Sequence, residues 1–274
     1  MEARLADVVT GKARVRLEIE TGFGHAVGDQ IEALVRRELQ KTRWEVEVLK
    51  VSEFVTKALG ELGYSSESHP SIQDMYERLR EADWWSPLVV SKKSIEDFAE
   101  NGTASDWQQA GADLVLLRGD LIFDAKSEVV LLNVKSHDTS RSSRPPNIMS
   151  AQRLLEFLAS ILRSGNAKTW LEKASLLFVG VEYDGSNKHI GEIFVKDLFK
   201  LSVTQIPQIN FDAAIQIQWH VRDMKEIRQT KLEFIERLAR RFDADWKAHA
   251  EQKTKLYRSL LDQIAGSLGH LREA

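Results

Sequence analysis

Hydrophobic residues recur along the chain with two different periods, and the alternation between them predicts an α/β fold. Short runs that are continuously apolar, or apolar at every second position, are typical of strands. They occupy residues 12–20, 112–117, 129–134, 174–184, 190–195 and 215–221. Apolar residues spaced three and four apart predict helices instead. These segments cover residues 29–39, 44–62 after a short extended start, 71–81 and 150–163.

The first and last helical segments set the expected organisation. Asp29 is placed to cap the helix at 29–39. From Met224 onward the chain is dense in both charges, and its apolar positions predict a pair of packed helices. No internal repeat or long linker interrupts the pattern. We therefore predict a single domain over residues 1–274, with an α/β core at about 12–223 and a helical C-terminal part at about 224–274.

Composition narrows the class of protein. With 274 residues, 43% of them hydrophobic, the chain can bury a substantial core, and the absence of cysteine excludes disulfides and zinc-thiolate sites. No apolar run reaches the about 20 residues that span a bilayer, and the N-terminus lacks the apolar core of a signal peptide. We expect a soluble, cytoplasmic protein with no membrane partner. The net charge of −3 argues against nonspecific DNA coating, but it allows a DNA enzyme with a local basic cleft.

Two pairs of neighbouring residues allow more than one interpretation. Trp84 and Trp85 are expected to anchor the core or a dimer interface rather than to stack on bases. Lys92 and Lys93 are expected to be solvated rather than bound to phosphate.

The stretch from Ala112 to Ser136 carries the most informative chemistry. Its apolar runs flank turn-rich residues at 118–120 and 124–127, which predicts a strand meander. Asn133 and Lys135 are two residues apart on the last strand, so they share one face of it. Asp113 begins the neighbouring strand and can reach the same face. A carboxylate, a second oxygen donor and a lysine are therefore expected to converge.

This trio suits the hydrolysis of a phosphodiester. Carboxylate and other oxygen ligands hold Mg²⁺ together with substrate phosphates, and the metal lowers the pKa of its bound water. A lysine can stabilise the charge that develops on phosphorus or orient the attacking water. The alternative is a buried hairpin whose Asp and Lys merely occupy its solvated ends, because such spacing also arises by chance.

A polar, basic loop follows this stretch. Its charged and hydroxyl side chains are suited to contact with DNA, and the prolines at 145 and 146 stiffen it. The candidates for DNA binding here are Ser136, Arg141, Arg144 and Asn147. A solvated connection is the alternative interpretation.

Several segments, in the same order, give the chain a more specific resemblance. They are residues 24–28 with 31–35, 112–114 with 131–135, 146–151, and 213–223, which include a Gln-Ile-Gln-aromatic-His-Val-Arg-Asp run. The chain resembles type II restriction endonucleases of the HincII type, within the PD-(D/E)XK nuclease superfamily. The resemblance spans most of the chain. It implies an α/β core with a central mixed β-sheet flanked by helices, followed by a helical C-terminal extension.

The resemblance also implies roles for individual residues. Asp113 matches the metal-binding carboxylate, Lys135 the catalytic lysine, and the Val134 carbonyl an additional metal ligand. Glu32 matches an auxiliary acid on the first helix. Three further matches concern DNA: Asn147 with a base contact beside the scissile step, Arg144 with a side chain inserted into the base stack, and Asn210 with a major-groove contact.

The chain departs from the family pattern at three points. Asn133 replaces the second acid, so a neutral amide oxygen takes the place of a charged metal ligand and metal affinity should fall. The interval between Asp113 and Asn133 is longer than the pattern has it, with residues 118–126 as the expected extension. The inserted side chain is an arginine rather than a glutamine.

The resemblance implies a homodimer that uses Mg²⁺ to cut both strands of double-stranded DNA at a short palindrome. It further implies 5′-phosphates, blunt ends, a six-base-pair site with a central pyrimidine–purine step, and a cognate DNA methyltransferase as genetic partner. Two alternatives remain on the same fold: a DNA-binding protein whose catalysis is weakened or lost through Asn133, and a structure-specific nicking or repair nuclease. An α/β domain of unrelated function is the third.

Overall fold

The computed structural model describes residues 25–41, 45–68, 71–106, 111–140, 147–187, 189–206, 208–211, 216–218 and 225–273. The helices are α2 (His25–Gln40), α3 (Val51–Glu61), α4 (Ile72–Arg80), α5 (Ser86–Val89), α6 (Lys92–Asn101), α7 (Ala151–Arg163), α8 (Ala167–Lys173) and α9 (Lys231–Glu273). The strands are β1 (Glu47–Lys50), β2 (Leu114–Arg118), β3 (Glu128–Asp138), β4 (Asn147–Ser150), β5 (Leu176–Asp184), β6 (His189–Asp197), β7 (Gln208–Asn210) and β8 (Gln216–Gln218). Short 3₁₀ turns lie at Ser66–Ser68, Leu198–Lys200 and Val203–Gln205.

Within the described residues, five strands form the central sheet, in the order β1-β2-β3-β5-β6. β3 and β5 run parallel, whereas the other neighbours are antiparallel, so the sheet is mixed as predicted. A crossover through β4, α7 and α8 joins β3 to β5. The remaining strands form a second, three-stranded sheet in the order β4-β8-β7.

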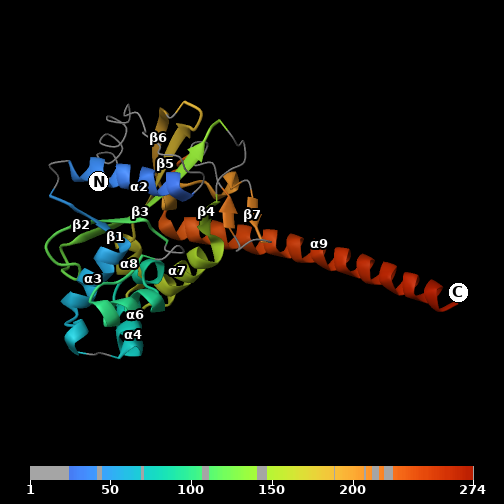
Figure 1. Cartoon of the computed structure of the whole chain (residues 1–274), viewed down its shortest axis with the longest axis horizontal. Coiled ribbons are helices and arrows are strands. Elements are labelled where there is room, and N and C mark those ends of the chain that lie inside the picture. Colours follow the sequence, from blue (N-terminus) through green and yellow to red (C-terminus); the bar gives the residue numbers. More distant parts are fainter. Residues whose placement is uncertain are drawn as a thin grey trace.

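Helices cover both faces of the central sheet (Figure 1). On one face, α2 packs the apolar stripe of Val27, Ile31, Val35 and Leu39 against alternate residues of the strands. On the other face lies a larger cluster, contributed by α3 to α8, the small sheet and the first turns of α9. Because successive strand residues point to opposite faces, burial on both faces explains why β2 and β3 are almost continuously apolar.

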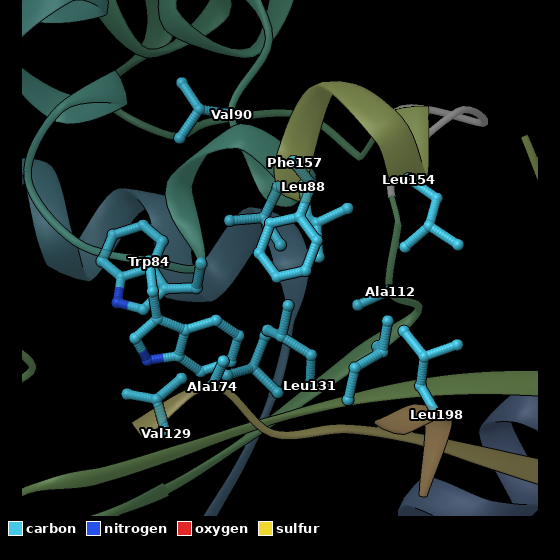
Figure 2. Close-up of a cluster of buried hydrophobic side chains, with 14 of the residues drawn as sticks. Trp84, Leu88, Val90, Ala112, Val129, Leu131, Leu154, Phe157, Ala174 and Leu198 are labelled. Carbon is cyan, nitrogen blue, oxygen red and sulfur yellow. The ribbon is translucent and has the colours of Figure 1, made fainter. Parts of the chain in front are cut away.

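The two tryptophans belong to the larger core. Trp84 is 2% exposed and Trp85 is fully buried. Trp85 meets Phe54 edge to face, and Trp84 lies against Phe157 of α7. Figure 2 shows Trp84 and Phe157 among Leu88, Val129 and Leu131, above the strands. The expectation that these residues serve the core is therefore confirmed, and base stacking by them is excluded.

The connection between β2 and β3 differs from the expected meander. Residues 119–127 form turns rather than a further strand, so β2 and β3 make a two-stranded hairpin. Gly119 turns the chain with φ of 112°, which glycine adopts without steric cost. The Glu61 carboxylate then accepts hydrogen bonds from the amides of Ile122 and Phe123. Because these amides bond to a side chain, the apolar residues between the turns have no strand partner.

Three further expectations were wrong. α2 begins at His25, so Asp29 lies inside the helix and does not cap it. The C-terminal part is one helix of 43 residues rather than a pair, and it extends away from the body (Figure 1). The apolar spacing of the helix predicted at 150–163 also assigns Leu162 to the core, but Leu162 is 44% exposed on α7.

Some expectations lie outside the described residues, among them the strand at 12–20. Of the helices that the structure describes, none combines the length and the apolar character needed to cross a membrane.

The packing of α7 generates a stability prediction. Phe157→Ala removes a fully buried ring from the larger core and should lower the free energy of unfolding by about 3–5 kcal/mol. Leu162→Ala, on the exposed side of the same helix, should change it by less than about 0.5 kcal/mol. Denaturant unfolding of the three proteins measures both values. Equal losses for the two variants would contradict the assignment of the core face of α7.

Candidate active site

The pairing of β2 with β3 places Asp113. Leu114 pairs with Leu132, and the amide of Asp113 donates to the Leu132 carbonyl at 2.8 Å. Because β2 begins at Leu114, it provides no strand residue to pair with Val134. Instead, Oδ2 of Asp113 accepts the hydrogen bond of the Val134 amide at 2.5 Å. The carboxylate thus takes the position of a strand partner, and this fixes where it lies.

Lys135 completes the contact that the spacing predicted. Its Nζ lies 3.5 Å from Oδ2 of Asp113, and the two side chains are 25% and 27% exposed. Asn133 and Lys135 alternate with Val134 along β3, so they share the face that Asp113 reaches. Across the parallel pair, Lys135 lies opposite Gly180 of β5, which has no side chain to compete for space.

Asn133 is the most constrained polar group at the site. The residue is only 2% exposed, and its Nδ2 donates to the carbonyl of Gly111 at 3.1 Å. The Gly111 carbonyl can only accept a hydrogen bond, so the amide atom beside it is the nitrogen and the other amide atom is the oxygen. Oδ1 is buried and has no hydrogen-bond partner among the residues that the structure describes. Leaving a buried acceptor unsatisfied costs about 1–3 kcal/mol, so a bound cation would relieve a real penalty.

Glu32 approaches the site from α2. The pKa of its carboxyl is raised from 4.5 to about 7, chiefly by burial and in addition by the negative charge of Asp113, while Lys50 opposes the shift. An interaction with Asp113 of this kind requires that the two carboxylates lie near one another. The structure therefore brings Glu32 near Asp113, which also contacts Lys135.

The groups present fit a hard divalent cation. They comprise the carboxylate of Asp113, the unpartnered amide oxygen of Asn133, the carboxyl of Glu32 and the backbone carbonyl of Val134, all of them oxygen donors. The Val134 carbonyl is included because the N–H and C=O of one strand residue point to the same side, and its N–H points to Asp113. Within the described ranges no three His, Cys, Asp or Glu side chains form a metal-binding group. An amide thus stands where a third such ligand is expected.

The DNA-binding candidates are distributed over two regions. Ser136 follows Lys135 on β3 and is half-buried. Asn147 begins β4 and Asn210 ends β7, so both belong to the small three-stranded sheet. Arg141 and Arg144 lie outside the described residues.

The structure extends β3 by two residues, His137 and Asp138, which the sequence analysis assigned to the following loop. β3 continues to Asp138, so His137 lies on the same strand face as Lys135. Its Nδ1 is 3.9 Å from Oε1 of Glu182, opposite it on β5. One residue on, Asp138 accepts hydrogen bonds from Ser140 and from the amide of Gly185. The apolar run ends at Val134, which is why the pattern alone ended the strand too early.

The pKa of Glu32 generates a prediction about stability. Because the folded-state pKa is raised above the unfolded value, Glu32 favours folding below about pH 4.5, and this contribution is lost as the pH rises through 7. Glu32→Gln should therefore raise the thermal midpoint relative to the wild type at pH 8, but not at pH 4.5, when both are measured in EDTA. Glu100→Gln, at an exposed position of α6, is the control and should show no such pH-dependent difference. A Glu32→Gln effect that is the same at both pH values would show that the carboxyl is not strained at this site.

Comparison with known proteins agrees with this geometry. The profile of the family described as Restriction endonuclease HincII matches residues 5–260. The chain is 26% identical over 222 residues to the type II restriction enzyme HincII of Haemophilus influenzae, covering 80% of this chain and 79% of that enzyme. It is equally similar to the type II restriction enzyme HindII of Haemophilus influenzae (strain ATCC 51907 / DSM 11121 / KW20 / Rd), with the same identity and coverage. Because the profile match spans most of the chain, the chain belongs to the HincII family of restriction endonucleases, and its mixed sheet flanked by helices is the PD-(D/E)XK nuclease fold.

Proposed function

We propose that this restriction endonuclease hydrolyses phosphodiesters of double-stranded DNA at a short palindromic site, with Mg²⁺ as cofactor, and leaves 5′-phosphates and blunt ends. The observation that carries the proposal is the convergence of three groups. The Asp113 carboxylate, the unpartnered Asn133 oxygen and the Lys135 ammonium all lie where β2 begins, beside the middle of β3. Membership of the HincII family supports DNA as the substrate.

Each residue has a distinct part in this mechanism. Asp113, Asn133 and the Val134 carbonyl would hold the metal. When bound, Mg²⁺ supplies a water of lowered pKa and offsets charge on the phosphoryl oxygens. Lys135 places its ammonium beside the reacting phosphate, where it stabilises the charge that develops in the transition state. Glu32, whose pKa is near 7, is an auxiliary acid that can accept a proton at neutral pH.

Two active sites are needed to cut a duplex. We infer a homodimer, because a twofold axis places one site on each strand of a palindrome. In this arrangement Ser136, Arg141, Arg144, Asn147 and Asn210 contact the DNA, and Arg144 inserts beside a central pyrimidine–purine step, which unstacks easily. A DNA methyltransferase that protects the same site is the expected genetic partner.

One observation favours a second candidate, a DNA-binding protein with weakened catalysis. Asn133 contributes no negative charge to the metal site, so the metal binds less tightly than it would to an acid. Against this candidate, Lys135 remains in contact with Asp113.

Digestion of plasmid DNA with Mg²⁺, followed by sequencing of the ends, tests the proposal. We expect double-strand breaks at one palindromic sequence with flush, 5′-phosphorylated ends. Nicks alone, or cutting that follows DNA structure rather than sequence, would indicate a structure-specific nuclease. Binding without cutting at any Mg²⁺ concentration would favour the weakened protein.

Lys135→Ala should abolish cleavage while leaving DNA affinity nearly unchanged. The ammonium acts on charge that appears only in the transition state, so its loss should lower the rate by about 10²–10³-fold or more. Lys126→Ala removes an exposed lysine of the β2–β3 connection and serves as the control. Single-turnover cleavage and equilibrium binding of one duplex measure the two effects separately. Near wild-type cleavage by Lys135→Ala would remove Lys135 from the mechanism.

Asn133→Asp should make the thermal stability of the protein depend on Mg²⁺ more strongly than it does in the wild type. Without Mg²⁺ the new carboxylate faces the Gly111 carbonyl, where Asn133 now donates a hydrogen bond, so the thermal midpoint should fall. With Mg²⁺ the added charge binds the cation, so the variant should recover more stability than the wild type and reach half-maximal cleavage at a lower Mg²⁺ concentration. Thermal melts and cleavage rates over a Mg²⁺ titration test this. An unchanged metal requirement would mean that position 133 does not touch the metal.

A further inference from the structure

A histidine and a glutamate lie next to the candidate active site and have no part in the mechanism above. His137 is two residues after Lys135 on β3, so the two side chains share one face of the strand. The parallel pairing of β3 with β5 places His137 opposite Glu182. Nδ1 of His137 lies 3.9 Å from Oε1 of Glu182, and the two side chains are 21% and 16% exposed. An imidazole with a carboxylate beside it therefore follows Lys135 along the strand.

This face of β3 passes from the core to the surface. Leu131 is fully buried in the larger hydrophobic cluster, and Asn133 is 2% exposed. The next two side chains on the face, Lys135 and His137, are 25% and 21% exposed. A substrate that reaches Lys135 from solvent therefore lies next to His137 as well.

The backbone around His137 is held in place by β5. One residue beyond the end of β3, the amide of Thr139 donates to the Tyr183 carbonyl at 2.9 Å. The Asp138 carboxylate accepts from the amide of Gly185 at 3.1 Å, and a Cβ atom at position 185 would lie only 2.5 Å from Oδ2 of Asp138. Because its neighbours are fixed in this way, His137 can meet a ligand at a low entropic cost.

Stability alone does not explain the pair. Its separation is longer than a hydrogen bond, and partly solvated ion pairs contribute little to the free energy of unfolding. Glu182 also places a negative charge close to the approach of an anionic substrate, which it would repel unless a cation lay between them. The arrangement therefore favours His137 as the group that meets the substrate.

The chemistry of the pair suits a phosphate. A protonated imidazole donates hydrogen bonds from both ring nitrogens. Nδ1 is on the Glu182 side, so Nε2 is the nitrogen that can donate to a phosphate oxygen. Residues two apart on a strand are separated by about 6.5–7 Å. This distance is comparable with the spacing of successive phosphates along one DNA strand, so Lys135 and His137 can meet neighbouring phosphates.

We propose that His137 binds the DNA phosphate adjacent to the one that Lys135 contacts, and that Glu182 positions its imidazole. The inference rests on the proposed function, because it takes double-stranded DNA as the substrate and Lys135 as the residue beside the reacting phosphate. It makes β3 the strand that follows the DNA backbone, with two side chains on two successive phosphates. Such contacts set the register of the duplex on the protein and do not read its sequence.

Equilibrium binding without divalent metal tests the contact. The variants are His137→Ala, His137→Gln and His137→Arg, and Lys126→Ala, which removes an exposed cation before β3, is the control. The duplex carries the site that the wild type cuts or, failing cleavage, a site selected by binding. In a second set of duplexes an uncharged methylphosphonate replaces one phosphate at a time. Each affinity is measured over a salt series at about pH 6, below the usual imidazole pKa of about 6.5.

We expect His137→Ala and His137→Gln to bind the unmodified duplex about 10- to 100-fold more weakly, with unchanged thermal midpoints. Their plots of log affinity against log salt should lose about one unit of slope, because one phosphate contact is lost. His137→Arg should keep affinity and slope, and Lys126→Ala should change neither. His137→Gln keeps the test decisive if the alanine variant fails to fold.

The methylphosphonate duplexes distinguish a phosphate contact from a structural role. At one position the wild type and His137→Ala should bind equally well, because the phosphate that His137 contacts no longer carries charge. A purely structural role would not depend on a single phosphate. The same difference between the two proteins at every position, or an unchanged salt slope, would overturn the proposal.

A double-mutant cycle tests the positioning role of Glu182. Glu182→Gln should strengthen DNA binding in the His137→Ala background, where the carboxylate faces the phosphate with no imidazole between them. In the wild-type background the same change should not strengthen binding, because it removes the partner of the imidazole. Equal effects in the two backgrounds would overturn this role.

Cleavage with Mg²⁺ separates the inference from the proposed function. If the wild type binds a duplex but does not cut it, the proposed hydrolysis fails and the binding measurements decide the inference by the same criteria. If the wild type cuts and the His137 variants keep its affinity and salt slope, the inference alone fails. If the wild type neither binds nor cuts duplex DNA, both are overturned.

Discussion

The hydrogen bond from the Val134 amide to the Asp113 carboxylate is the interaction on which the site depends. β2 and β3 pair up to Leu114 and Leu132, and beyond them the carboxylate substitutes for a strand partner. A shift of one residue between the strands would turn Asn133 and Lys135 to the opposite face, away from Asp113. The arrangement of the proposed catalytic residues is therefore a consequence of strand register. The two hydrophobic clusters fix that register, because β2 and β3 contribute alternate residues to each of them.

The site carries electrostatic strain that a cation would relieve. The Asn133 oxygen is buried without a partner within the described part of the chain, and the pKa of Glu32 is raised to about 7 by burial and by Asp113. Both features disfavour the metal-free state. A rigid core can hold such groups in place, because the cost of a few kcal/mol is spread over extensive packing on both faces of the sheet. In the proposed metal site, relief of this strain would offset part of the affinity that an amide in place of an acid at position 133 costs.

Sequence predicted the parts of this site that depend on short-range geometry. The two-residue spacing of Asn133 and Lys135 is enough to place them on one face, and the apolar runs located their strand. The assignment of Glu32 to the site followed only from the family resemblance, since nothing in the sequence indicates that Glu32 of α2 lies near Asp113. The bond from Asn133 to Gly111 depends on how the chain enters β2 and has no local signal. The alternation at residues 215–221 predicted a strand, of which the structure describes Gln216–Gln218 as β8, whereas the three residues of β7 are too few to show a period of their own. The single helix α9, in contrast, has no proline or glycine between Lys231 and Ala265, a local signal that favours one continuous helix.

The proposed metal site at Asp113 and Asn133 can be located on the protein by cleavage of the polypeptide with bound iron. Fe²⁺ is substituted for Mg²⁺, and hydroxyl radicals generated at the bound iron by ascorbate and peroxide cut the polypeptide near the metal. We expect fragments that end near Asp113 and near Asn133 to Lys135, and we expect excess Mg²⁺ to suppress them. Cuts elsewhere in the chain, or cuts at these residues that excess Mg²⁺ does not suppress, would contradict it.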